Sequence, residues 1–167
     1  DALSGNPALL LGIIFMVAGF GFKISTVPFQ MWVPDVYEGA PTPVAAYLSV
    51  ASKAAGFAVI LRVFYIALGN ISLDWSQIFA VLAAFSMTLG NVVAITQNNI
   101  KRMLGYSTIA HAGYMMVGLA AIGPQGASLG PGGVLFYLAA YAFTNLGAFF
   151  AIISISNKIG SDQIGDF

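Results

Sequence analysis

The sequence contains no cysteine and a single histidine among its 167 residues. A disulfide framework, a thiolate-bound iron–sulfur cluster and a Cys/His zinc site therefore cannot be built from this chain, and a haem with two histidine ligands is excluded as well. We expect the chain to hold no cofactor and no metal ion. Any redox centre of the working assembly is expected on another subunit.

Charged residues are also scarce. They make up 7% of the sequence, whereas 59% of the residues are hydrophobic, and the mean hydropathy is +0.87. Ordinary soluble domains contain about one quarter charged residues. The net charge is zero, so neither nucleic acid binding nor a polybasic membrane-surface patch is indicated. This composition predicts an integral membrane protein surrounded by the lipid bilayer.

The sequence starts without an initiator methionine or a basic leader, which indicates an internal segment without a signal peptide. We expect residues 1–167 to form a single transmembrane domain that is part of a larger subunit. Apolar runs separated by polar, proline-rich or glycine-rich breaks predict an all-α integral membrane bundle of about five transmembrane helices. The expected helices cover residues 6–32, 42–68, 78–96, 103–122 and 130–156.

Prolines and charged residues add three expectations to the predicted helix bundle. The first helix should be broken near Pro28, since a proline inside a helix removes a backbone donor. Residues 34–43 are rich in proline and carry Asp35 and Glu38, so we expect a rigid connector outside the bilayer with two solvated acids. Lys101 and Arg102 place their face in the cytoplasm by the positive-inside rule and need no other role.

Two lysines lie inside apolar runs on either side of this connector. Lys23 comes ten residues or so before it and Lys53 about ten residues after it, so at a rise of about 1.5 Å per residue both ammonium groups are expected near mid-membrane. A lysine in a low-dielectric surrounding can release or bind its proton as a neighbouring charge changes. The spacing predicts a proton relay, and the structural alternative is a kinked helix with lysines that reach the headgroups.

Three further residues are candidates for the same pathway. His111 should lie at the depth of the lysines, as either a proton relay or an interhelical hydrogen-bonding group. Tyr141 and Asn145 belong to a polar stripe with Tyr137 at a spacing of four residues. This stripe would line ordered water or hold helices together, and the sequence leaves both possibilities open.

Several stretches resemble the antiporter-like N subunits of complex I, the proton-pumping NADH:quinone oxidoreductase. The resemblance covers essentially the whole chain and includes the interval between Lys23 and Lys53. The motifs that carry it are Gly21-Phe-Lys-Ile-Ser-Thr-Val-Pro-Phe29, Trp32-Val-Pro-Asp-Val-Tyr-Glu-Gly-Ala-Pro-Thr-Pro43, Ser52-Lys53, Lys101-Arg-Met-Leu-Gly-Tyr-Ser107 and Ala110-His-Ala-Gly-Tyr114.

The resemblance implies that these helices are the seventh to eleventh of fourteen. It also implies that Lys23 lies on a discontinuous helix and pairs with a glutamate on an earlier one. Lys53 would be the next relay and a lysine on the twelfth helix the last. Neither that glutamate nor the last lysine is in this chain, and Asp35 and Glu38 are in the wrong place to replace the glutamate.

The function that follows is a proton-translocating membrane subunit of the oxidoreductase, coupled to quinone reduction elsewhere in the complex. Expected partners are other membrane subunits of complex I and a quinone bound elsewhere, with no nucleic acid. The expected location is a bacterial inner membrane, or a thylakoid membrane if the quinone is plastoquinone. The alternatives are a membrane subunit of a cation/proton antiporter and a structural membrane scaffold.

Overall fold

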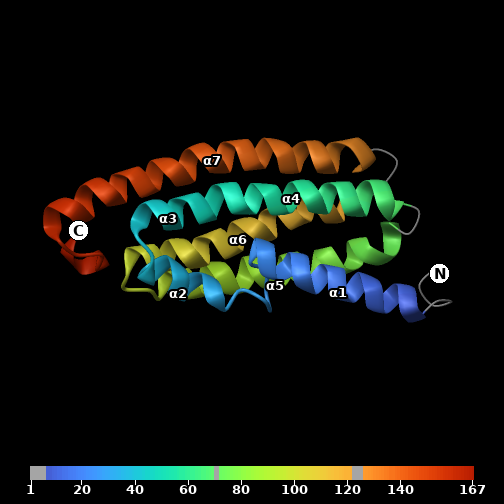
Figure 1. The fold of residues 1–167 in the computed structure, drawn as a ribbon, viewed down its shortest axis with the longest axis horizontal. Helices are drawn as coiled ribbons and strands as arrows, with labels where there is room; N and C mark the ends of the chain where they lie inside the picture. The colour runs from blue at the N-terminus through green and yellow to red at the C-terminus, as the bar shows by residue number, and fades with distance from the viewer. Residues whose placement is uncertain (1–6, 70–71, 122–125) are drawn as a thin grey trace.

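The computed structural model describes residues 7–69, 72–121 and 126–167, and its long helices run roughly along one common axis (Figure 1). The elements are α1 Pro7–Ile24, α2 Trp32–Gly39, α3 Thr42–Tyr47, η1 Leu48–Ser52, α4 Lys53–Leu61, η2 Arg62–Ala67, α5 Ser72–Ile95, α6 Ile100–Ala120, α7 Gly126–Ile159 and η4 Ile164–Asp166. Elements η1 and η2 are π-helical turns, and η4 is a short 3-10 helix.

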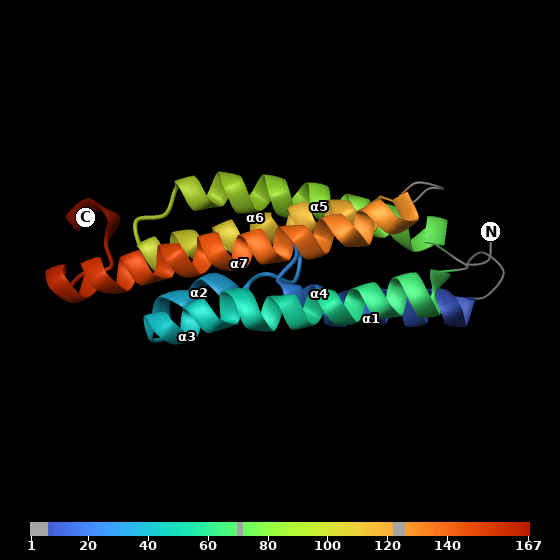
Figure 2. The same ribbon diagram turned by 90° about the horizontal axis from the view of Figure 1, so that it is seen from above.

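The predicted all-α membrane bundle is confirmed. Four stretches of the described chain are long and apolar enough to cross a membrane, namely Pro7–Ile24, Thr42–Ala67, Trp75–Ile95 and Leu129–Ile159. Helix α6 is not among these four stretches, but it contacts α2, α5 and α7 and runs alongside them (Figure 2). Helix α1 starts at one end of the bundle and α7 finishes at the opposite end in both views (Figures 1 and 2).

The predicted break in the first helix is confirmed and extends over residues 25–31. Pro28 lies in it and supplies no backbone donor, and Ser25 adopts the left-handed conformation with φ 66°. Two hydrogen bonds hold the broken backbone inside the bundle: Val27 N donates to Ser86 Oγ at 3.0 Å, and Trp32 Nε1 donates to the Phe22 carbonyl at 3.1 Å. Irregular backbone at membrane depth requires such internal partners.

The rigid connector expected over residues 34–43 is largely helical. Residues 32–39 form helix α2, which continues in line with α1 beyond the break (Figure 1). Pro34 is compatible with this helix because it lies in the first turn, where no intrahelical donor is needed. Val33 and Tyr37 are one helical turn apart and buried, and the Pro34 backbone lies against Gly105 of α6.

Two of the predicted helix starts also need correction. Helix α5 begins at Ser72 instead of residue 78, and α7 begins at Gly126 instead of residue 130. Hydropathy marks the apolar middle of a membrane span, so it misses a polar first turn in the interface region.

Two kinds of contact hold the bundle together. Phe64, Trp75 and Phe79 are almost fully buried and meet edge to face, with ring centroids 4.9 to 5.9 Å apart. Helices α5 and α6 approach so closely that a Cβ atom on Gly90 would lie 2.6 Å from the backbone nitrogen of Ala110. Close approach through small residues is the usual mode of helix association in membranes.

This contact predicts the effect of adding one methyl group to α5. Replacement of Gly90 by alanine should destabilise the protein by about 1–3 kcal/mol, because the new Cβ overlaps the α6 backbone. The measurement is the thermal unfolding of the purified membrane protein in detergent. Gly147→Ala is the matched control, since a Cβ there meets nothing within 4 Å. Equal melting temperatures for the two variants would contradict the proposed role of the α5–α6 contact.

Candidate functional site

Lys53 is the most deeply buried cation of the described chain, with 2% of its surface exposed. It lies near the middle of the run Thr42–Ala67, directly after the π-helical turn η1. Its Nζ donates a hydrogen bond to the Thr108 carbonyl of α6 at 2.5 Å, and no described carboxylate forms an ion pair with it. Since π-turns inside α-helices often mark functional positions, this lysine is the centre of the candidate site.

Lys23 lies in the last turn of α1 and is exposed in this chain, so the expectation of two buried cations is correct only for Lys53. Its Cγ atom lies 3.4 Å from the position that a Cβ on Gly56 would occupy, and Gly56 follows Lys53 by about one helical turn. The stem of Lys23 therefore runs close to the level of Lys53. Its side chain stays exposed because α1 packs mainly against α4.

His111 lies on α6 one turn beyond Thr108 and is half-buried. Its Nδ1 is 2.7 Å from the Tyr137 hydroxyl, and its ring centroid is 4.9 Å from that of Tyr141. The charge of Lys53 acts electrostatically on the imidazole. The sequence-based expectation that Lys53 and His111 lie at a similar depth agrees with this placement.

Asn145 and Tyr141 extend the polar region along α7, and both are buried. Asn145 Nδ2 donates to Ser49 Oγ at 2.6 Å, and Ser49 Oγ donates to the Ala46 carbonyl at 2.7 Å. The Tyr141 hydroxyl has no hydrogen-bond partner within the described residues. An unsatisfied buried hydroxyl is costly and is commonly met by an ordered water.

Sequence reasoning missed two residues that connect these groups. Tyr37 of α2 is buried, and its hydroxyl lies near the side chains of Thr108 and Ser49. Thr108 is also the residue whose carbonyl holds Lys53. Tyr37 could have been found from its spacing of four residues after Val33, which places both on one face of a helix, but Thr108 carries no such signal.

Buried and half-buried polar groups thus gather between α2, α6, α7 and the run that contains η1 and α4. They are Asn145, Ser49, Tyr37, Thr108, Lys53, His111 and Tyr137. Within residues 7–69, 72–121 and 126–167, no group of three or more potential metal-ligating side chains is gathered. Among these polar side chains, Lys53, His111 and Tyr137 can bind and release protons.

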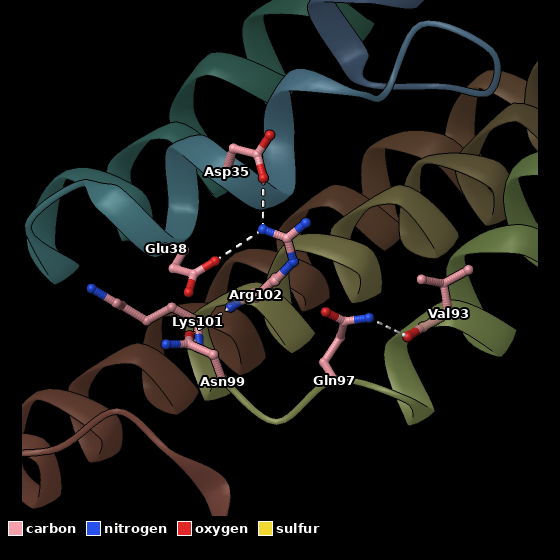
Figure 3. Close-up of polar contacts among 7 residues, drawn as sticks. All are labelled: Asp35, Glu38, Val93, Gln97, Asn99, Lys101 and Arg102. Atoms are coloured by element: carbon pink, nitrogen blue, oxygen red, sulfur yellow. Dashed lines mark hydrogen bonds and ion pairs between the residues drawn. The ribbon is translucent and has the colours of Figure 1, made fainter.

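A second polar cluster lies at the end of the bundle that carries α2 and the start of α6 (Figure 3). Arg102 Nη1 contacts Asp35 Oδ1 at 2.6 Å and Glu38 Oε2 at 2.9 Å. Asp35 and Glu38 are exposed, as expected of solvated acids, and both are also ion-paired with Arg102. The pairs tie α2, the second half of the broken helix, to α6.

Lys101 makes the equivalent connection to the chain after α7. Its Nζ lies 3.0 Å from Asp162 Oδ2 and donates to the Ala40 carbonyl at 3.3 Å. The backbone of residues 98–100 also hydrogen-bonds residues 162–164. Burial acts to raise the pKa of Asp162, but hydrogen bonds and the Lys101 charge outweigh it and leave this pKa below its ordinary value. The ion pair therefore persists at neutral pH.

A comparison with known protein families shows to which family the chain belongs. The model of the family described as NADH:quinone oxidoreductase/Mrp antiporter, transmembrane, matches residues 1–166. The chain belongs to this family. Together with the membrane spans, this makes it a multi-pass membrane protein of a bacterial or thylakoid membrane.

Individual relatives agree with this family. The NADH-quinone oxidoreductase subunit N of Dehalococcoides mccartyi is 54% identical over 170 residues, which cover 99% of this chain and 35% of that protein. The NAD(P)H-quinone oxidoreductase subunit 2 of Synechocystis is 51% identical over 167 residues, or 100% of this chain and 31% of that protein. This chain spans about a third of the length of these curated relatives.

A solved structure shows the same fold. A chain of respiratory complex I from Thermus thermophilus matches with a TM-score of 0.69 at 38% sequence identity. The match covers 86% of this chain and 30% of that chain. The family's relatives are thus subunits of NADH-quinone oxidoreductase, and the resemblance of the sequence motifs is confirmed.

The ion cluster at the start of α6 generates a prediction about α2. Replacing Arg102 by glutamine should loosen α2, because Asp35 and Glu38 lose their shared partner. Ion pairs this exposed contribute at most about 1 kcal/mol, so amide hydrogen exchange in residues 32–39 should rise by about fivefold or less. Mass-spectrometric exchange measures this directly. Lys158→Gln is the control, since Lys158 is exposed, and equal exchange of α2 in both variants would argue against the cluster.

Proposed function

We propose that this chain is the central part of a proton-translocating membrane subunit of an NADH:quinone oxidoreductase. The observation that carries the proposal is Lys53, which is buried in the middle of a membrane span without a carboxylate partner in the described chain. Burying an unpaired cation costs several kcal/mol in real proteins. A group that opposes folding so strongly is expected to serve the transport of charge.

Lys53 has the properties of a proton relay. The Thr108 carbonyl accepts one of its hydrogen bonds, whereas an ammonium has three donors. The ammonium form is thus only partly compensated by protein groups, so a change of charge nearby can shift the equilibrium between NH₂ and NH₃⁺. Such a lysine releases its proton when a second positive charge arrives next to it.

We propose His111 as the group that exchanges protons with Lys53. It lies one turn along α6 from the carbonyl that holds Lys53, and the two groups interact electrostatically. Tyr141 and Asn145 are proposed to line this part of the path. Tyr141 supplies a buried hydroxyl without a partner in the described residues, and Asn145 is bonded to Ser49 beside the π-turn.

Lys23 is proposed as the proton-carrying group that precedes Lys53 in the relay. As a cation in the last turn of α1 it lies next to carbonyls that have no intrahelical donor, where a positive charge is favoured. The resemblance implies a glutamate partner on a preceding helix of the longer protein. That helix would also cover the exposed face of Lys23, since a charge in contact with lipid is costly.

The rest of the enzyme lies outside this chain in this proposal. Electron transfer and quinone reduction take place on other subunits, and this segment contributes no redox cofactor. Its partners are the neighbouring membrane subunits and the bilayer, and residues 1–167 form one transmembrane domain of the larger subunit. The complex would use a ubiquinone- or menaquinone-type quinone in a bacterial membrane, or plastoquinone in a thylakoid.

A second candidate is a membrane subunit of a cation/proton antiporter, because the matching family includes the Mrp antiporters. The two functions differ in their driving force. The oxidoreductase acidifies or alkalinises vesicles only while NADH is oxidised, whereas an antiporter responds to an imposed sodium gradient without NADH.

The test of the proposal is Lys53→Met in the intact complex, reconstituted in vesicles. Methionine keeps the length and apolar stem of the side chain but cannot carry a proton. We expect the number of protons translocated per NADH oxidised to fall severalfold, measured with a pH-sensitive dye during turnover. Assembly of the complex is checked on native gels.

Lys158→Met is the matched control for this substitution. Lys158 is exposed in the last turn of α7, so its loss should leave the proton yield unchanged. An unchanged yield in Lys53→Met would support the scaffold function instead and end the relay proposal for that residue.

A further inference from the structure

The only described hydrogen-bond partner of the His111 side chain is Tyr137. The distance from Nδ1 to the Tyr137 hydroxyl is 2.7 Å, which is short for a bond between a ring nitrogen and a hydroxyl. The ring planes are tilted by 47° with their centroids 5.9 Å apart, so the phenol meets the edge of the imidazole. The contact is therefore a directed hydrogen bond, and it leaves Nε2 as the nitrogen open to other groups.

A hydroxyl suits this position because it can both donate and accept. When His111 is neutral with its proton on Nε2, the phenol O–H donates to Nδ1. When the ring is doubly protonated, Nδ1–H donates to the phenol oxygen after a rotation of the hydroxyl. One partner thus serves both protonation states without movement of the helices, and a phenylalanine at this position would serve neither.

The backbone fixes this pair of side chains. A Cβ atom on Gly118 would lie 2.6 Å from Val134 Cγ2, and one on Gly130 would lie 2.5 Å from the Gly118 carbonyl oxygen. Helices α6 and α7 therefore meet with little more than backbone between them, about two turns from His111 and one to two turns from Tyr137. This close approach sets the spacing that brings Nδ1 and the hydroxyl together.

The other ionisable groups around His111 are few in the described chain. Lys53 faces it from α4, Tyr137 and Tyr141 face it from α7, and Tyr114 lies on its own helix with ring centroids 5.6 Å apart. Tyr114 is itself occupied, since its hydroxyl accepts a hydrogen bond from Asn91 Nδ2 at 2.7 Å. No carboxylate is part of this surrounding among the described residues.

We propose that Tyr137 is a positioning residue for His111: its hydroxyl holds Nδ1 in both protonation states and thereby directs proton exchange to Nε2. This inference rests on the proposed function, because it assigns a role within the same relay. It adds a residue for which the sequence offered only a choice between bundle contact and water lining.

The test compares two tyrosine hydroxyls in the intact complex in vesicles. Tyr137→Phe removes the partner of Nδ1 and keeps the ring. Tyr65→Phe is the matched control, since the Tyr65 hydroxyl contacts the same helix α6 but bonds only main-chain carbonyls, those of Gly118 and Leu119, at 3.1 Å. Protons translocated per NADH oxidised are measured across a range of pH, with His111→Gln as a third variant.

We expect the pH midpoint of the proton yield to move down by about half a unit to one unit in Tyr137→Phe. The reason is that a hydrogen bond to a charged group is stronger than one to a neutral group, so its loss penalises the imidazolium more. Tyr65→Phe should keep the wild-type profile. A purely structural hydroxyl would change stability in either variant without moving the midpoint.

The outcomes separate this inference from the function on which it rests. If His111→Gln lowers the proton yield and Tyr137→Phe keeps the wild-type pH midpoint, the positioning role is overturned and the relay through His111 stands. If His111→Gln has a wild-type yield and midpoint, His111 is no relay, and both the relay and the inference fail at this residue.

Discussion

The hydrogen bond between the Lys53 ammonium and the Thr108 carbonyl is the interaction on which the candidate site depends. It is made between two helices at the middle of the bundle, and no described carboxylate shares it. A carbonyl compensates only part of the lost hydration of an ammonium. The surrounding protein must therefore hold Lys53 in place, and the Thr108 carbonyl is the partner that the structure provides.

The broken helix contributes to this arrangement from a distance. Because α1 ends at Ile24 and α2 starts at Trp32, the chain can place Tyr37 against Thr108 while Lys23 remains at the end of α1. The break is tolerated because Ser86 and the Phe22 carbonyl satisfy nearby donors, as irregular backbone in a membrane demands.

The ion pairs at the start of α6 neutralise two cations that lie in the first turn of this helix. Asn99 caps this helix by accepting from the backbone of Lys101 and Arg102, so both cations lie in the first turn. Positive charge is unfavourable at that end of a helix. Carboxylates from α2 and from the segment after α7 neutralise the two cations, and in doing so they anchor both segments to α6.

The sequence by itself determined the class of the protein, the break near Pro28 and the similar level of Lys53 and His111 along the bundle. These follow from hydropathy, from proline chemistry and from the fixed rise of a helix, which act along the chain. Only the tertiary structure decided that Lys23 is exposed in this chain, that residues 32–39 form a helix, and which hydroxyl or carbonyl each buried group meets. Those outcomes depend on how the faces of different helices are turned toward one another, and spacing along one helix carries no information about its neighbour.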